Sequence, residues 1–213
     1  MMRPTSPFAY RPPALFAVLA AAALLAPPYS RADVPVREDI IVSPAPQNFT
    51  ICFNGACKDL AFVSLSTAQW RRVTAIFTPP AGSPAIERQR IAQAVALMET
   101  LAGEITRTHR DRPRNGSDPQ GANQMDCIDE STNTTTYLKL LARDGLLHWY
   151  TVEDRATRGW FLFGWPHTTA VIRERPSGKD YVVDSWFLEN GRPPFIVPLT
   201  TWRNGWQPPP DKP

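Results

Sequence analysis

One stretch constrains the fold more than any other part of the chain, because it predicts a helix that begins at a solitary cysteine. Residues 124–145 read QMDCIDESTNTTTYLKLLARDG. Asp126 is a good helix N-cap, since its side-chain oxygen can accept the free N–H groups two or three residues later. Gly145 can end the helix in the left-handed conformation. Cys127 is then the first helical residue, and apolar side chains supply the second half of the helix (Tyr137, Leu138, Leu140, Leu141).

This position bears on the chemistry of the Cys127 thiol. Only the thiolate is a nucleophile, and a helix N-terminus favours the anion through its unpaired N–H groups and the positive end of the helix dipole. Asp126, Asp129 and Glu130 surround the same helix start, and their charges raise the thiol pKa if they lie near the sulfur. The two effects oppose each other, which weakens the case for activation by the helix alone.

The first 32 residues have the pattern of a secretory signal. Arg3 and Arg11 precede an apolar run over residues 14–26, and Ser30-Arg31-Ala32 offers small residues before a cleavage site near Ala32. The run is shorter than the roughly 20 residues that cross a bilayer, so an uncleaved anchor is the less favoured alternative. We therefore expect a periplasmic or secreted protein.

The charge of the mature chain excludes two classes of partner. Residues 1–32 hold three of the 23 basic residues and no acidic residue, which leaves 20 basic against 20 acidic residues after cleavage. A neutral chain without a basic stripe offers no electrostatic footprint for nucleic acid or for an anionic membrane surface. We expect neither partner beyond the membrane contact of the signal peptide itself.

Two of the three cysteines predict a disulfide. Cys52 and Cys57 flank Asn54-Gly55, and Asn-Gly between apolar residues is a strong signal for a two-residue type I′ hairpin. In such a hairpin Cys52 faces Cys57 across a non-hydrogen-bonded pair, close enough for a bridge. The alternative is a reduced pair in a strand. Cys127 is left unpaired in either case, which is unusual in an exported protein.

The rest of the mature chain indicates a single α+β domain. We expect an extended arm over 33–47, with an edge strand at 39–42 as an option, a domain over 48–205 and a solvated proline-rich tail over 206–213. Ser66 caps a short helix, and Ser83 with Pro84 begins a longer one that runs to about His109. Its apolar stripe predicts packing against the Cys127 helix (Ile91, Val95, Met98, Leu101, Ala102, Ile105). Four later segments have the pattern of strands: LLHWYTVE, WFLFGWPHTTAVIRE, KDYVVDSWF and FIVPL.

Three short motifs place a cysteine, a histidine and an aspartate in that order along the chain. Cys127 lies in DCIDESTNTTTYL, His167 follows 40 residues later in WPHTTAVIRE, and Asp184 follows 17 residues after that in DYVVDSWF. This order of helix cysteine, strand histidine and strand aspartate resembles the transglutaminase-like superfamily, and is most similar to the bacterial transglutaminase-like cysteine peptidases. The resemblance covers roughly residues 65–199. It implies a papain-like fold, with N-terminal helices and a central catalytic helix packed on an antiparallel sheet.

The resemblance also implies roles for these residues. Cys127 would be the nucleophile, His167 the general base, and Asp184 the residue that orients the imidazole. The Cys127 backbone N–H would bind the developing oxyanion, and Gln124 is a candidate second donor by its position. The expected activity is acyl transfer on an amide of a peptide or protein, including cell-wall peptides, by hydrolysis or by transamidation. The chain has no paired-cysteine metal motif and no glycine-rich phosphate loop, so we expect no metal and no cofactor.

Several other interpretations stay open at this stage. Cys127 can be an inert buried cysteine, and the domain can be an inactive periplasmic module that binds a peptide. Asp184 in an apolar strand needs a partner, and Arg173 is the alternative to His167. His148 is a second candidate histidine. An arylamine acetyltransferase would use the same three residue types, but export argues against acetyl-coenzyme A as donor. The sequence leaves the substrate and the oligomeric state undetermined.

Overall fold

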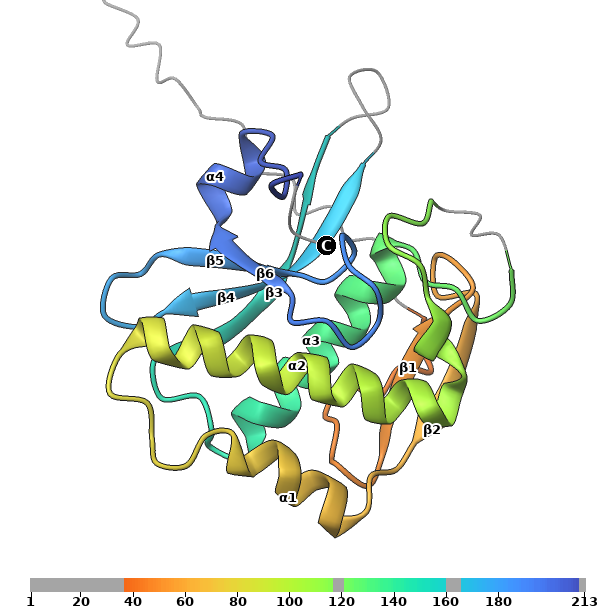
Figure 1. The fold of residues 1–213 in the computed structure, drawn as a ribbon, viewed down its shortest axis with the longest axis horizontal. Helices are drawn as coiled ribbons and strands as arrows, with labels where there is room; N and C mark the ends of the chain where they lie inside the picture. Colours follow the sequence, from red (N-terminus) through yellow and green to blue (C-terminus); the bar gives the residue numbers. More distant parts are fainter. Residues whose placement is uncertain (1–36, 117–120, 160–165, 211–213) are drawn as a thin grey trace, which may run out of the picture. The chain divides into compact units, whose positions relative to one another are not determined.

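A computed structural model describes residues 37–116, 121–159 and 166–210 of the chain. Within these ranges the chain forms four α-helices and two antiparallel sheets, which confirms the predicted α+β class (Figure 1). None of these helices combines the length and apolar character needed to span a bilayer. In chain order the elements are β1 (Phe49–Phe53), β2 (Asp59–Val63), α1 (Thr67–Ala75), α2 (Pro84–Thr106), a 3₁₀ turn (Thr108–Arg110), α3 (Cys127–Arg143), β3 (Tyr150–Arg158), β4 (His167–Glu174), β5 (Asp180–Asp184), β6 (Phe195–Pro198) and α4 (Leu199–Arg203).

The larger sheet has the strand order β3-β4-β5-β6, and each neighbouring pair is antiparallel. Because side chains alternate between the two faces of a strand, successive residues enter different cores. Ile172 and Val183 belong to the main core with residues of α2 and α3, whereas Val171 and Val182 pack with Trp202 of α4. Each of the four predicted segments contains a strand, but β3 begins at Tyr150 and continues through a charged stretch to Arg158, and β5 ends at Asp184, three residues before the end of its predicted segment. The first part of the segment WFLFGWPHTTAVIRE lies outside the described residues.

The two long helices pack against each other, as their apolar stripes predict (Figure 1). The Ser83 side chain caps α2 by accepting from the Ile86 N–H, and Pro84 is the first helical residue. The helix ends at Thr106, three residues before the predicted end, because Arg107 adopts a left-handed conformation with φ of 67°. Ile105, which we placed on the buried stripe, is 47% exposed.

The first hairpin contains the predicted disulfide but not the predicted turn. Cys52 and Cys57 are bonded, with 4.6 Å between their Cα atoms. However, Phe53 pairs with Asp59 and Cys52 pairs with Leu60, so the loop between the strands spans five residues, 54–58, instead of two. Asn54, Gly55, Ala56 and Cys57 all have positive φ, so the left-handed turn that Asn-Gly favours continues into the next two residues. The prediction of a type I′ hairpin with Cys52 opposite Cys57 was therefore wrong.

The two ends of the described domain also differ from the expectation. Residues 39–42 form turns and bends and add no strand to either sheet. Trp206, which we assigned to the solvated tail, packs on Phe195 and Phe187 at ring distances of 5.3 and 5.8 Å. The packed domain therefore continues past the predicted boundary at residue 205.

Candidate functional site

The N-terminus of α3 is held by its own acidic residues. Asp126 is the N-cap, as predicted, and its Oδ1 accepts from the N–H groups of Ile128 and Asp129 at 2.9 and 3.0 Å. Asp129 returns a bond by accepting from the Asp126 N–H at 3.1 Å, which completes a capping box. Cys127 is therefore the first residue of the helix, where N–H groups lack intrahelical acceptors.

The same carboxylates hold the disulfide loop. Asp129 accepts from the N–H groups of Gly55 and Cys57, both at 2.7 Å, and Asp126 Oδ2 accepts from the Ala56 N–H at 2.9 Å. Successive residues with positive φ point their N–H groups into one concavity, which is a typical way for backbone to bind an anion. Two of the three carboxylates that we expected near the sulfur, those of Asp126 and Asp129, thus bind the hairpin loop and anchor it to the start of the helix.

A histidine–aspartate pair forms on the larger sheet. His167 begins β4 and Asp184 ends β5, and His167 Nε2 lies 2.8 Å from Asp184 Oδ2. Both side chains are buried. The indole N–H of Trp202 donates to the same Asp184 oxygen at 2.8 Å. Asp184 therefore has two donors that offset its desolvation, and Arg173, the alternative partner, pairs instead with Asp180 and Glu153.

The Cys127 sulfur lies against the start of β4. Its Sγ is 3.9 Å from the carbonyl oxygen of Pro166, the residue before His167, and the Thr168 N–H also interacts with it. His167 Nδ1 is buried and has no hydrogen-bond partner among the described residues. Because Nε2 is committed to Asp184, Nδ1 is the only ring nitrogen left to accept a proton from the thiol. The structure thus brings the three predicted residues to adjoining positions, but sulfur and imidazole are not hydrogen-bonded.

Burial dominates the ionisation of the thiol. Desolvation raises the pKa of Cys127 to about 12, the Thr168 N–H lowers it in part, and the carboxylates of Asp126 and Asp184 raise it further. The predicted advantage of the helix N-terminus is therefore outweighed. In this arrangement the thiol is neutral at pH 7, and it needs a base in order to react.

Gln124 forms hydrogen bonds to the loop over residues 110–115. Its Oε1 accepts from the Arg112 N–H and from Asn115 Nδ2, and its Nε2 donates to the Arg110 carbonyl at 3.0 Å. These contacts give the side chain a structural role, while its predicted contribution to an oxyanion hole stays a prediction.

His148, the second candidate histidine, lies apart from this site, and the cysteines of the disulfide are not free to bind a metal. His148 is exposed just before β3, and its backbone N–H donates to Glu87. Cys52, Cys57 and Asp129 offer ligand atoms within 4.8 Å of one another, but the two sulfurs are bonded to each other and the carboxylate already accepts three N–H groups.

An aromatic shell around His167 was not predicted as such. Trp186, Phe187 and Trp202 surround the imidazole with ring centroids 4.4, 5.3 and 5.5 Å away. Arg158, opposite His167 in the sheet register, lies over the Trp202 ring at 4.4 Å. No short motif marks Trp202 or Arg158, and Arg158 lies in a charged stretch that has no strand pattern in the sequence.

Trp202 is therefore a positioning residue for Asp184. We expect Trp202→Phe to lower the free energy of unfolding by about 1–2 kcal/mol, because a buried carboxylate loses one donor. The pH profile of Cys127 alkylation should also change, since Asp184 would hold the imidazole less firmly. Trp206→Phe is the control, because the Trp206 ring contacts Phe187 and Phe195 and not Asp184. Equal effects of the two substitutions on the alkylation profile would contradict a positioning role.

No family model, no curated protein and no solved structure matches this chain. What points to a function is therefore the three sequence motifs and the geometry of Cys127, His167 and Asp184.

Proposed function

We propose that this protein is a cysteine-dependent acyl-transfer enzyme with a transglutaminase-like, papain-like core. The observation that carries the proposal is the buried His167–Asp184 pair, whose second ring nitrogen is unpartnered among the described residues, beside a cysteine at a helix N-terminus. A carboxylate on one imidazole nitrogen fixes the tautomer that leaves the other nitrogen free to act as a base. That is the arrangement that a thiol with a raised pKa needs.

The proposed reaction has two stages, formation of a thioester on Cys127 and its resolution. His167 Nδ1 takes the thiol proton as Cys127 Sγ attacks the carbonyl carbon of an amide, and Asp184 stabilises the resulting imidazolium. The Cys127 N–H has no acceptor within its helix and can donate to the developing oxyanion. The C–N bond then breaks, His167 returns the proton to the leaving amine, and a thioester remains. Water or a second amine resolves this thioester, which gives a peptidase or amidase in the first case and a transglutaminase in the second.

The compartment and the substrate are parts of the same proposal. The signal-like residues 1–32 and the Cys52–Cys57 disulfide support export to the periplasm or medium, where thiols in pairs are oxidised. Exported proteins and cell-wall peptides are then the accessible amide substrates. No step of the mechanism requires a metal or an organic cofactor.

The rival is an inactive peptide-binding module of the same fold. The raised thiol pKa and the missing sulfur–imidazole hydrogen bond favour this rival. The two proposals differ in whether His167 changes the reactivity of Cys127.

The test is the rate of Cys127 alkylation by iodoacetamide between pH 5 and pH 9, followed by mass spectrometry. We expect His167→Ala to lower the rate near pH 7 by about 100-fold, which is the usual contribution of a general base. Asp184→Asn should lower the rate by a smaller factor, because the imidazole loses its orienting partner. His148→Ala removes an exposed histidine and is the matched control. Equal rates in wild type and His167→Ala would support the inactive module.

A further inference from the structure

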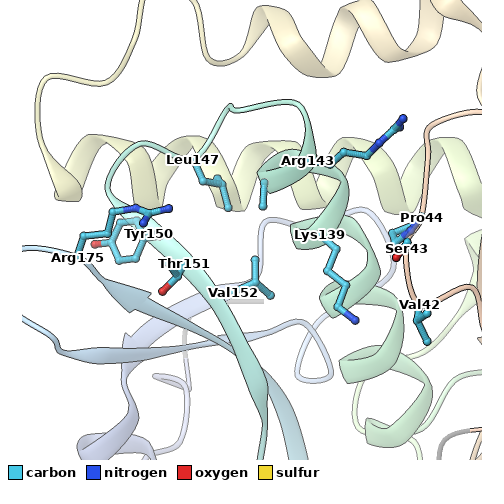
Figure 2. Close-up of a pocket in the computed structure, with 11 residues that line it drawn as sticks. Val42, Ser43, Pro44, Lys139, Arg143, Leu147, Tyr150, Thr151, Val152 and Arg175 are labelled. Atoms are coloured by element: carbon cyan, nitrogen blue, oxygen red, sulfur yellow. The ribbon is translucent and has the colours of Figure 1, made fainter.

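A hollow at the opposite end of α3 carries an unassigned set of charges. It has a volume of about 530 Å³ and lies between the C-terminal half of α3, the start of β3 and residues 42–44 (Figure 2). Lys139 and Arg143 project from α3, and Arg175 follows β4 beside Tyr150 on the other side of the hollow. No aspartate or glutamate is among the described residues that line it.

These three cations are available to a ligand. Lys139, Arg143 and Arg175 are all exposed, and within the described part of the chain none of them belongs to an ion pair. The neighbouring Glu174 carboxylate already accepts hydrogen bonds from Arg88, Tyr150 and Ser177. The described residues of the lining therefore carry three positive charges and no carboxylate, which makes the hollow electrostatically complementary to a ligand with several negative charges.

The edge of the sheet adds a second kind of recognition. β3 is an edge strand, because β4 is its only partner in the described ranges. The Arg175 N–H donates to the Trp149 carbonyl at 2.9 Å, so the backbone of Trp149 faces β4. Backbone groups alternate sides along a strand, so the N–H and C=O of Tyr150 and Val152 point away from β4. Tyr150 is fully buried, whereas Val152 is partly exposed and lines the hollow, so Val152 offers the accessible part of this edge. An unpaired strand edge of this kind accepts an extended segment through main-chain hydrogen bonds.

We propose that this hollow binds an extended acidic peptide segment. The main chain of the segment pairs with β3 at Val152, and its carboxylates lie beside Lys139, Arg143 and Arg175. Val42, a 74% exposed apolar residue on the rim, gives the segment an apolar contact. An extended segment is favoured over a compact anion because charge and an open strand edge occur on the same hollow. The proposal concerns binding alone, so it does not depend on the reactivity of Cys127.

The location connects the hollow with the candidate site. Lys139 is 12 residues from Cys127 along α3, which corresponds to roughly 18 Å of helix. β3 runs from Tyr150 at the hollow to Arg158, which pairs with His167. A segment held at the hollow can thus continue along β3 towards the sulfur.

The test is fluorescence anisotropy of the full mature chain with a fluorescein-labelled octapeptide of alternating glutamate and threonine, repeated with Cys127→Ser to keep binding apart from turnover. Replacement of every glutamate by glutamine should weaken binding by about 10-fold or more, since each 1.4 kcal/mol of lost charge pairing is a factor of ten. Lys139→Ser with Arg143→Ser should have a similar effect, and Arg175→Ser a smaller one. The matched control is Arg71→Ser with Arg72→Ser, which removes the same charge from exposed positions of α1.

Each contrary outcome rejects the proposal. Equal binding of the glutamate and glutamine peptides would show that charge does not select the ligand. Equal losses in the α3 and α1 double variants would show that only net charge matters. A peptide of alternating glutamate and proline lacks the backbone N–H at every second residue. If its affinity is unchanged, the hollow binds anions without pairing to the strand. If the α3 double variant is unstable, the Arg175→Ser variant and the peptide series decide independently.

Discussion

The free energy of unfolding is expected to fall by a few kcal/mol when the pH is raised from 5 to 8. The cause is a cluster of buried carboxyl groups between α2 and α3. Burial and the neighbouring Asp111 raise the pKa of Glu99 to about 8, burial raises the pKa of Asp111 to about 7, and burial with the charges of Glu99 and Asp111 raises the pKa of Glu130 well above its usual value. One Glu99 oxygen accepts from the Gly191 N–H, and the other has no partner among the described residues.

The sign follows from proton uptake. The unfolded chain releases these protons near pH 4, whereas the folded chain keeps them up to about pH 7 to 8. Stability is therefore fully present below the unfolded pKa values and is lost as the pH rises through the folded ones. Ionisation would leave like charges in a buried site, which explains why the folded protein holds the protons.

Urea denaturation at pH 5, 6.5 and 8 measures this effect. Glu99→Gln should flatten the pH dependence, because glutamine keeps an oxygen for the Gly191 N–H without a charge to bury. Glu104→Gln, at an exposed position of the same helix, is the matched control and should leave the profile unchanged. A protein that becomes more stable towards pH 8, or a Glu99→Gln variant with the wild-type profile, would contradict the assignment.

Local signals predicted the elements well where one physical effect dominates. Ser83 and Pro84 begin α2 as expected, because capping and proline geometry depend on a few adjacent residues. Val182 and Asp184 share a face of β5, since alternation along a strand leaves little freedom. The histidine–aspartate contact follows from placing two motifs on adjacent antiparallel strands.

Contacts between residues far apart in the sequence explain the predictions that were wrong. The Asn-Gly signal at residues 54–55 describes an isolated hairpin, but the carboxylates of Asp126 and Asp129, more than 65 residues away, draw the following N–H groups into a longer loop. The sequence cannot show that Glu99 is buried, because a glutamate in a helix is usually solvated.

At the candidate site, the burial of Cys127 likewise could not be predicted from the sequence. Its position at the start of the helix was predicted, but the direction of its pKa shift was not, because that shift is set by desolvation, which depends on the packed environment. The helix dipole is worth about 1 kcal/mol, whereas burial of an anion is worth several.

Removal of the Asp129 carboxylate should destabilise the protein by about 4 kcal/mol. The side chain is fully buried and accepts from three backbone N–H groups, those of Gly55, Cys57 and Asp126. Asp129→Ala leaves these donors without an acceptor, and each unsatisfied buried donor costs about 1–3 kcal/mol. The three donors together cost about 3–9 kcal/mol, and partial entry of water, which relaxation of the loop permits, keeps the expected loss near the lower end of that range.

The disulfide makes this experiment informative about the loop as well as about stability. Because the Cys52–Cys57 bond persists in Asp129→Ala, the loop keeps its covalent closure and its hydrogen bond from Ala56 to Asp126, and it loses the two hydrogen bonds from Gly55 and Cys57 to α3. We therefore expect faster amide hydrogen exchange at Gly55 and Cys57 together with a lower denaturation midpoint. Asp59→Ala is the matched control, since Asp59 is an exposed carboxylate that accepts from the Asn54 side chain of the same loop at 2.6 Å, and its loss should change stability by less than about 1 kcal/mol. Equal losses in the two variants would mean that the loop is held by its own strands and not by the helix that begins at Cys127.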